Sequence, residues 1–465
     1  MKRRNFIRLS LFTSIYLSTN INAKQNILNK KKLIIPKLNI GILKNGIRNF
    51  DMQIKESNHI FFNGYITNTY GINQNYLGET IKLTNNETVS INYTNNLKEA
   101  VTMHGHGMHL PASQDGTAHQ SILPNRSWSS KFKVNQKACT NWYHSHAMNK
   151  TAEHVYKGLA GLIIIEDNEI NNLQLPKDYG KDDIPLILQD RFFDQNGQLY
   201  YKPQMREVMM GYTSNTLVAN GVIDPYIEVE TKIIRFRILN GSNSSIYNLS
   251  FNDYRTFFQI ATDNSLLEAP VELYNLILSP GERAEILVDF SEDLDESISL
   301  VDRRFGKSFL NILVNKEVAT STEIPNKLTT LKKYSKKDVV NTRYFELSGS
   351  MGKFNINGVS MDINYINESV PINSIEIWEI KNDMMMTHNF HIHATHFMII
   401  QRDGKVSNVL NNEKGYKDTV RIPGGESVKF IVKMVDYKDK KIPYMYHCHF
   451  LEHEDAGMMG QFIVV

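Results

Sequence analysis

The chain of 465 residues has little cysteine, no long apolar run after its start and no excess of either charge. Two cysteines exclude a disulfide scaffold and an array of zinc ribbons. Lys and Arg number 52 against 49 for Asp and Glu, but four of the basic residues lie within the first 23, so the remainder is near neutral. We therefore expect no nucleic-acid partner. No later apolar stretch approaches the ~20 residues that span a bilayer, so we expect no membrane span.

The composition is that of a globular protein with several domains. Hydrophobic residues make up 41% and charged residues 22%, which argues against disorder and collagen-like repeats. At about 100–200 residues per domain, the chain should hold two to four domains.

The first 23 residues predict an export signal. Met1–Asn5 is basic, Leu9–Leu17 is apolar, and Ile21–Ala23 is a plausible cleavage site. The Arg3–Ile7 segment resembles the twin-arginine signal of proteins exported in the folded state, and an ordinary secretory peptide is the alternative. Either signal predicts export, and we expect a periplasmic location.

Most of the chain predicts short strands. Val89–Thr94 and Ile234–Ile238 alternate apolar with polar residues, which favours one face on a core and the other in solvent. In the second segment, Arg235 and Arg237 form the face expected in solvent. Ala160–Ile165 is a continuous apolar run, typical of a central strand. No long helical period dominates, so we predict an all-β protein.

A turn followed by an alternating strand recurs three times. Its prolines are Pro124, Pro280 and Pro423, at spacings of 156 and 143 residues. Turns of this kind are common before strands, but the regular spacing favours three β-sandwich domains. We expect them at residues 35–167, 183–315 and 338–465.

The histidines form closely spaced pairs. Residues two apart on a strand face the same side, about 6.6 Å from one another. Four such pairs present eight imidazoles, a donor set that suits copper, zinc, iron or nickel. The pairs are His104 with His106, His144 with His146, His391 with His393, and His447 with His449.

A cysteine within the last pair narrows the metal to copper. Cys448 lies between two histidines, so its sulfur should point away from their cavity toward a second site. His388, His453 and Met458 are placed to join it there. Two histidines, a thiolate and a weak axial methionine make a blue-copper site. The backbone at Cys448 would then connect the two sites as an electron path.

These segments resemble the four copper-binding motifs of multicopper oxidases. They are His104–Gly107, Trp142–His146, His388–His393 and His447–Met458, in the family's order, and the resemblance covers nearly the whole mature chain. It implies three cupredoxin-like Greek-key β-sandwich domains, with a trinuclear copper cluster between the first and the last. It also implies one-electron oxidation of a substrate at a type 1 copper, coupled to four-electron reduction of O₂ to water at the cluster.

Carried over position by position, the resemblance implies four copper ions and their ligands. The type 1 ligands are His388, Cys448, His453 and Met458, with Met459 as the alternative axial ligand; the type 2 ligands are His104 and His391; the type 3 ligands are His106, His144 and His449 for one ion and His146, His393 and His447 for the other.

Two carboxylates match acidic positions beside the cluster in bacterial members of the family. They are Asp115 and Glu454, and the resemblance implies that they relay the protons that O₂ reduction consumes. The alternatives are that Asp115 only anchors a turn and that Glu454 is solvated.

Three motif positions depart from the family pattern, none of them a ligand. Gly105 stands for the usual Trp, and Ser145 and Asn389 stand for the usual Pro, so local rigidity and copper potential could differ. The middle domain supplies no ligand, and we expect it to act as a spacer. The remaining histidines match no ligand position and should be ordinary polar residues or residues that support the ligands without binding metal; they are His59, His109, His119, His154 and His396.

The complete ligand set favours an oxidase over a copper-storage protein or a scaffold without metal. The chain most resembles bacterial copper-efflux oxidases, which oxidise Cu(I), and a laccase-like phenol oxidase is the alternative. Asp383, Met384 and Met385 precede His388, and their soft thioethers suit Cu(I) as a substrate metal. We expect O₂ and a small electron donor as partners, namely Cu(I), Fe(II) or phenols, and a monomeric protein.

Overall fold

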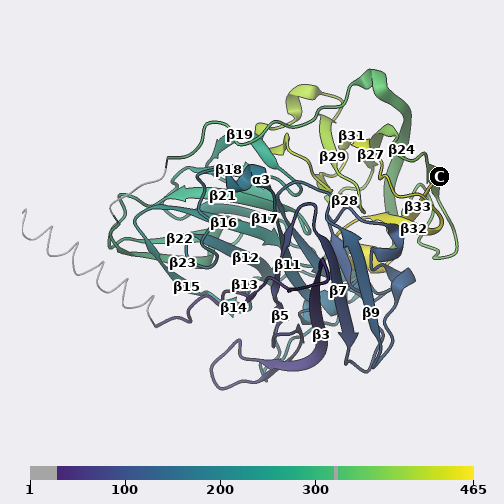
Figure 1. Cartoon of the computed structure of the whole chain (residues 1–465). Helices are drawn as coiled ribbons and strands as arrows, with labels where there is room; N and C mark the ends of the chain where they lie inside the picture. The colour runs from purple at the N-terminus through teal and green to yellow at the C-terminus, as the bar shows by residue number, and fades with distance from the viewer. Residues whose placement is uncertain (1–28, 319–322) are drawn as a thin grey trace, which may run out of the picture.

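The computed structural model describes residues 29–318 and 323–465, so the predicted export signal lies outside the described residues. Strands dominate these ranges, and each described α-helix has seven residues or fewer. Three sandwiches, each of two facing sheets, surround a common centre in Figure 1. The predicted all-β class with three cupredoxin-like domains is confirmed.

The first domain packs its two sheets around a core that includes Ile91 and Ile163. Ala160–Ile165 forms a fully buried strand between two neighbours, as its apolar run predicts. One sheet has the order β1 (Leu38–Asn39), β6 (Thr80–Thr84), β11 (Ala160–Glu166), β10 (Cys139–His144) and β8 (His104–His106). The other has β5 (Leu77–Gly78), β4 (Thr67–Ile72), β3 (Ile47–His59), β7 (Thr88–Asn95) and β9 (Ser127–Lys133), with β2 (Ile42–Lys44) beside β3.

The second domain contains the largest sheet among the described residues, with seven strands. Its order is β14 (Val222–Ile223), β13 (Leu217–Ala219), β12 (Asp183–Asp190), β16 (Ile233–Asn240), β21 (Arg283–Asp289), β18 (Phe257–Ala261) and β19 (Leu266–Leu273). The facing sheet has β15 (Tyr226–Glu230), β23 (Lys307–Lys316), β22 (Ser297–Asp302), β17 (Tyr247–Phe251) and β20 (Leu276–Leu278).

The third domain again pairs two sheets, and Cys448 and Met458 belong to its core. One sheet has β25 (Lys353–Ile356), β24 (Val339–Ser350), β27 (Ile375–Asn382), β31 (Ser427–Lys433) and β29 (Phe397–Arg402). The other has β26 (Glu368–Val370), β33 (Met459–Val464), β32 (Asp439–His447), β28 (His388–Ile392) and β30 (Thr419–Ile422).

Short helices connect the domains. Asp455, at the end of α5 (Leu451–Asp455), accepts hydrogen bonds from the Thr151 and Ala152 amides at the start of α2 (Thr151–Lys157), at 3.1 and 3.0 Å. No helix among the described residues is long and apolar enough to cross a membrane. The α-helices are α2 (Thr151–Lys157), α3 (Asn168–Asn171), α4 (Met205–Met210) and α5 (Leu451–Asp455). The 3₁₀ turns are η1 (Ala112–Gln114), η2 (Ala118–Gln120), η3 (Lys336–Asp338), η4 (Val406–Asn408) and η5 (Asn411–Glu413).

The expectation that one face of β16 lies in solvent is wrong. Arg235 and Arg237 are buried, because this face meets the first domain, where Thr140 Oγ1 lies 2.9 Å from Arg237 Nη1. Their charges are paired with Glu285 and Asp183, and Arg237 Nη2 donates to Asp183 Oδ2 at 2.8 Å. Buried charges need such partners, and alternation alone cannot distinguish water from a domain contact.

Strand register brings the histidine pairs into line. In the first domain β8 pairs with β10, which sets His104 opposite His144. In the third domain β28 pairs with β32, which sets His391 opposite His447. The two strand pairs face one another across the domain boundary, so imidazoles from both ends of the chain converge.

Candidate metal centres

Three imidazoles converge on one point from the first and third domains. His447 Nε2 lies 3.2 Å from His146 Nε2 and 3.1 Å from His393 Nε2. His447 Nδ1 donates to the Cys448 carbonyl and His393 Nδ1 to Asp115 Oδ2, so the protons of these two rings sit on the outer nitrogens. Lone pairs then face each other, an arrangement that a bound cation would stabilise.

Two further groups of three histidines lie beside the first. In each group the possible ligand atoms are within 4.8 Å of one another, and every member is buried. Several inward ring nitrogens have no hydrogen-bond partner among the described residues, as expected for atoms that hold a metal. The groups are His106, His144 and His449, and His104, His106 and His391.

A buried carboxylate of the third domain sets the orientation of His106. Asp418 Oδ1 accepts from His106 Nε2 at 2.8 Å, which leaves His106 Nδ1 without a partner and aimed inward. Asp418 is itself held by Arg283 of the second domain, whose Nη1 and Nη2 donate to its two oxygens at 2.8 and 2.6 Å. Neither residue is predicted as a site residue from the sequence, because neither lies in a histidine or cysteine motif.

Gly107 fits against this ion pair only because it lacks a side chain. A Cβ there would stand 2.6 Å from Asp418 Oδ2 and 2.7 Å from Arg283 Nη2, and its φ of +81° is in the region that favours glycine. The middle domain is therefore more than a spacer, since Arg283 reaches the layer next to the imidazoles.

Asp115 and Glu454 both lie against the histidine cluster and are buried. Asp115 Oδ1 lies 3.2 Å from His104 Nδ1, in addition to its bond to His393. Glu454 Oε2 lies 3.1 Å from His447 Nδ1, and its other oxygen lies 3.6 Å from His146 Nε2. Glu454 is thus shielded from solvent, contrary to the alternative that it is a solvated surface residue.

A second centre forms around the thiol on the other side of β32. Cys448 Sγ lies 3.6 Å from His388 Nδ1 and 3.8 Å from His453 Nδ1, and the two nitrogens are 3.1 Å apart. Atoms bonded to one ion at about 2.0–2.3 Å, as for zinc, stand at such separations. Met458 is fully buried in the core that contains Cys448, whereas Met459 is outside that core cluster.

Burial favours the neutral form of several of these imidazoles, and the neutral form is the one that binds a metal. It lowers the pKa of His146 to about 3, with a smaller contribution from the facing His447. It lowers the pKa of His388 and of His391 to about 4. Burial raises the pKa of Cys448 to about 12, so a metal that binds this sulfur must displace a proton.

The three motif departures each have a local structural consequence. At Gly105, an added Cβ would stand 3.0 Å from Met108 Cγ, so Met108 fills the space that a larger residue would need. Ser145 Oγ lies 2.8 Å from His154 Nδ1. Asn389 Oδ1 accepts from the His449 amide at 2.5 Å, and its Nδ2 donates to the Pro280 carbonyl at 2.8 Å.

The five histidines that match no ligand position each have a hydrogen-bond partner outside the histidine cluster. Cys139 is buried and free. The contacts are His59 with the Gly221 carbonyl, His109 with Asp436, His119 with Gln461, His154 with Ser145 and His396 with the Gly107 carbonyl.

The candidate substrate residues lie at the surface close to His388. Asp383 and Met385 are exposed, whereas Met384 packs in part against the core that contains Cys448. The structure adds α4 of the second domain to this surface. Met209 also packs against that core, and the backbone of Val208 and Met209 lies against the His453 ring. The helix α4 is not predicted to lie here from the sequence, because it is far along the chain from every copper motif.

Sequence models described as multicopper oxidase match residues 53–170 and 323–465. The multicopper oxidase mco of Staphylococcus aureus is 36% identical, over 95% of this chain and 94% of that protein. The chain belongs to the multicopper oxidase family. The chain is also similar to a protein named for another role. The cell division protein FtsP of Photorhabdus laumondii is 34% identical, over 88% of this chain and 87% of that protein.

Solved multicopper oxidases share the fold along nearly the whole chain. The laccase-like multicopper oxidase CueO of Ochrobactrum sp., with oxidase activity towards lignin model compounds, is 33% identical with a TM-score of 0.87, over 93% of this chain and all of that chain. A multicopper oxidase of Campylobacter jejuni, described as a metallo-oxidase, is 27% identical with a TM-score of 0.79, over 94% of this chain and 98% of that chain.

The family implies copper cofactors, and the donor sets present here fit them. Clustered imidazoles with inward nitrogens suit several transition metals, but two imidazoles beside a buried cysteine sulfur and a methionine indicate copper.

Proposed function

We propose that this multicopper oxidase is a cuprous oxidase that acts in copper tolerance and uses O₂ as electron acceptor. Four copper ions would supply one-electron oxidation of the donor and four-electron reduction of O₂. We assign the type 1 ion to His388, Cys448, His453 and Met458, and the type 2 ion to His104 and His391. We assign the type 3 pair to His106, His144 and His449 on one side and to His146, His393 and His447 on the other.

The chain itself orients these ligands and moves protons. Backbone carbonyls and the carboxylates of Asp115 and Asp418 hold the outer nitrogen of six of the eight paired histidines, so each of these six rings presents a defined inner nitrogen. Cys448 lies between two histidines of the cluster, which makes its backbone the shortest covalent route for electrons between the centres. Three acids contact those rings. Asp418 is held in an ion pair by Arg283, and we assign the proton relay to the other two, Asp115 and Glu454.

Thioethers gathered above the thiol centre carry the assignment of Cu(I) as substrate. Met384 and Met209 both pack against the third-domain core around Cys448. The Met209 sulfur lies 2.8 Å from the Gly352 amide, next to the exposed Met351. Met205 and Met210 of α4 and Met385 of the segment before β28 are exposed. Sulfur ligands select Cu(I), and the Asp383 carboxylate would favour the Cu(II) product.

The predicted export signal supports a periplasmic site of action, where the enzyme would meet Cu(I) outside the cytoplasm. We propose that it acts there as a monomer. A laccase-like oxidase of phenols is the alternative, since the CueO of Ochrobactrum sp. acts on lignin model compounds. Steady-state kinetics with Cu(I), Fe(II) and a phenol on copper-loaded protein distinguish these. We expect the highest kcat/KM with Cu(I); a higher value with the phenol would overturn the cuprous assignment.

The Cys448→Ser variant tests the copper assignment itself. We expect the copper content to fall from four ions to three per chain, with loss of the blue thiolate absorption and of oxidation of every donor. The histidine cluster should keep its type 2 and type 3 signals, because none of its ligands is changed. A variant that stays blue would show that another residue holds the type 1 ion.

A role in cell division is the second candidate, because several FtsP proteins are 33–35% identical to this chain. Histidine or cysteine is present at every predicted ligand position of these types, and their side chains form groups that could hold metal ions, which favours the oxidase. A chromosomal Cys448→Ser strain separates the two roles. An oxidase predicts copper sensitivity with normal division, whereas a division scaffold predicts no effect of this substitution.

A further inference from the structure

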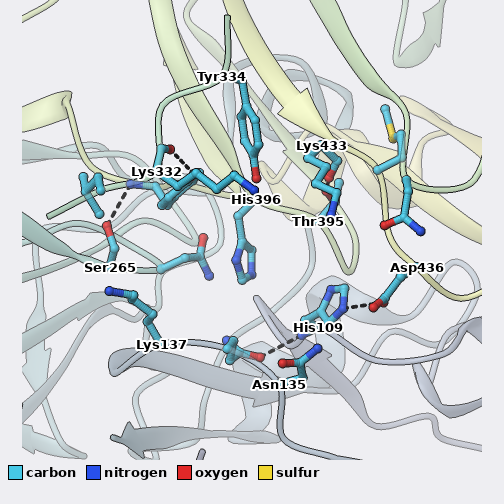
Figure 2. A pocket seen from close by; sticks show the side chains of 16 residues that line it. His109, Asn135, Lys137, Ser265, Lys332, Tyr334, Thr395, His396, Lys433 and Asp436 are labelled. Carbon is cyan, nitrogen blue, oxygen red and sulfur yellow. Dashed lines mark hydrogen bonds and ion pairs between the residues drawn. The ribbon is translucent and has the colours of Figure 1, made fainter. Parts of the chain in front are cut away.

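A pocket of about 270 Å³ opens where the three domains meet. Figure 2 shows Lys332 and Tyr334 on one side of it, Lys433 on another, and His109 and His396 below them. The first domain contributes Lys137 and the second Ser265. Ligand pockets are common at domain interfaces. None of the assigned copper ligands lines this one.

The walls of the pocket carry positive charge that the protein does not neutralise. Lys332 and Lys433 have no carboxylate partner among the described residues, and the Lys332 ammonium lies 5.6 Å from the centre of the Tyr334 ring. Lys137 is paired with Glu169 at 2.6 Å. Asp436, the acid of the lining, is engaged by His109 Nε2 at 2.9 Å. Two ammonium groups are therefore free to bind an anion.

The floor of the pocket is rigid and its donors are already used. His396, Gln136 and Asn264 all donate to the Gly107 carbonyl, at 2.9, 3.1 and 3.3 Å. Gly107 follows His106, so the floor also borders the imidazole cluster. Burial lowers the pKa of His396 to about 4, so this ring is neutral and adds no charge to the pocket at neutral pH.

We propose that this junction pocket binds a small oxygen-bearing dianion between Lys332 and Lys433. Ammonium groups make strong, charge-assisted hydrogen bonds to anionic oxygens, and no free carboxylate of the lining opposes them. The pocket's volume of about 270 Å³ is smaller than that of pockets for drug-sized ligands, so it suits an anion with few heavy atoms. A tetrahedral phosphate and a small dicarboxylate share this chemistry. The site is independent of the copper assignment and of the electron donor.

The test is calorimetric titration of the copper-loaded full chain with inorganic phosphate and, separately, with succinate, at constant ionic strength. We expect at least one of the two anions to bind at one site per chain. The anion that binds more tightly identifies whether the pocket takes a phosphate or a dicarboxylate. Each single substitution should weaken binding about tenfold, and the Lys332→Gln/Lys433→Gln variant about a hundredfold, since each charged hydrogen bond is worth about a factor of ten. The bound anion should also raise the Tm of the wild type but not of this variant.

The matched control is Lys336→Gln/Lys440→Gln, which removes the same charge from two exposed lysines outside the pocket. Equal weakening in this control would show diffuse charge attraction and overturn the proposal. Failure of both anions to bind the wild type would also overturn it. Blue absorption and thermal melting verify that each variant is folded; if the double variant is not, each single substitution must weaken binding for the proposal to stand.

Discussion

Asp115 contacts one histidine from each end of the chain. Its carboxylate accepts from His393 Nδ1 at 2.7 Å, and its carbonyl accepts from His104 Nδ1 at 2.9 Å. An amide keeps this shape but cannot release a proton. We expect Asp115→Asn to slow O₂ reduction by about 10²–10⁴-fold while the substrate still bleaches the blue absorption at the wild-type rate.

Anaerobic reduction and oxygen re-oxidation, followed separately by stopped flow, check this prediction. Glu99→Gln is the control, because it removes a carboxylate beside His154, an imidazole that is not among the assigned ligands. If the rate of re-oxidation by O₂ is unchanged in Asp115→Asn, this residue only anchors its turn and orients the histidine rings.

At the scale of elements, β21 of the second domain holds the cluster through one side chain. Arg283→Gln leaves the buried Asp418 carboxylate unpaired, which should cost on the order of 3–5 kcal/mol of unfolding free energy. Because Asp418 then no longer fixes the His106 ring, we also expect altered type 2 and type 3 signals in EPR and near-ultraviolet absorption.

The control for β21 lies in the same sheet. Arg235→Gln breaks the buried pair with Glu285, which does not contact the assigned ligands, so stability should fall while the copper spectra stay unchanged. Identical spectra in both variants would contradict a positioning role for Arg283.

The helix α4 and the segment before β28 should act together on Cu(I). Replacing Met205, Met209 and Met210 by Leu keeps their volume and removes three thioethers. We expect kcat/KM for Cu(I) to fall by about tenfold or more, a loss of roughly 1.4 kcal/mol, with little change for a bulky phenol.

Substitution of Asp383, Met384 and Met385 together should give the same selective loss. Met398→Leu is the control, since Met398 belongs to a separate buried cluster. Equal loss of both activities would instead indicate damage to the type 1 centre.

At the scale of the whole molecule, the many buried imidazoles make the copper-free protein sensitive to acid. The pKa of His388 and of His391 is lowered to about 4 in the folded state, so the unfolded chain binds protons more readily. Stability is fully present above the ordinary pKa near 6.5 and is lost as pH falls toward the folded values. A shift of this size corresponds to on the order of 3 kcal/mol per group.

Denaturation of copper-free and copper-loaded protein between pH 7.5 and pH ~4.5 tests this linkage. We expect both forms to lose stability steeply as pH falls, because the folded imidazoles bind few protons in either form while the unfolded chain binds them, and the bound metal displaces the loaded curve to higher stability. A copper-free form whose stability does not change over this range would contradict the lowered pKa of these imidazoles.

The sequence by itself determined the all-β class and the family, and it placed the histidines and Cys448 in groups. These properties follow from local order, because residues two apart on a strand share a face, and ligands in adjacent positions point to opposite sides. Only the tertiary structure decided the partners of those groups. Arg283 beside Asp418, α4 over the thiol centre and the lysines of the junction pocket are each far apart in the chain. Likewise, Arg235 and Arg237 read as a solvent face until another domain covers them, because alternation reports which residues share a face and not what that face contacts.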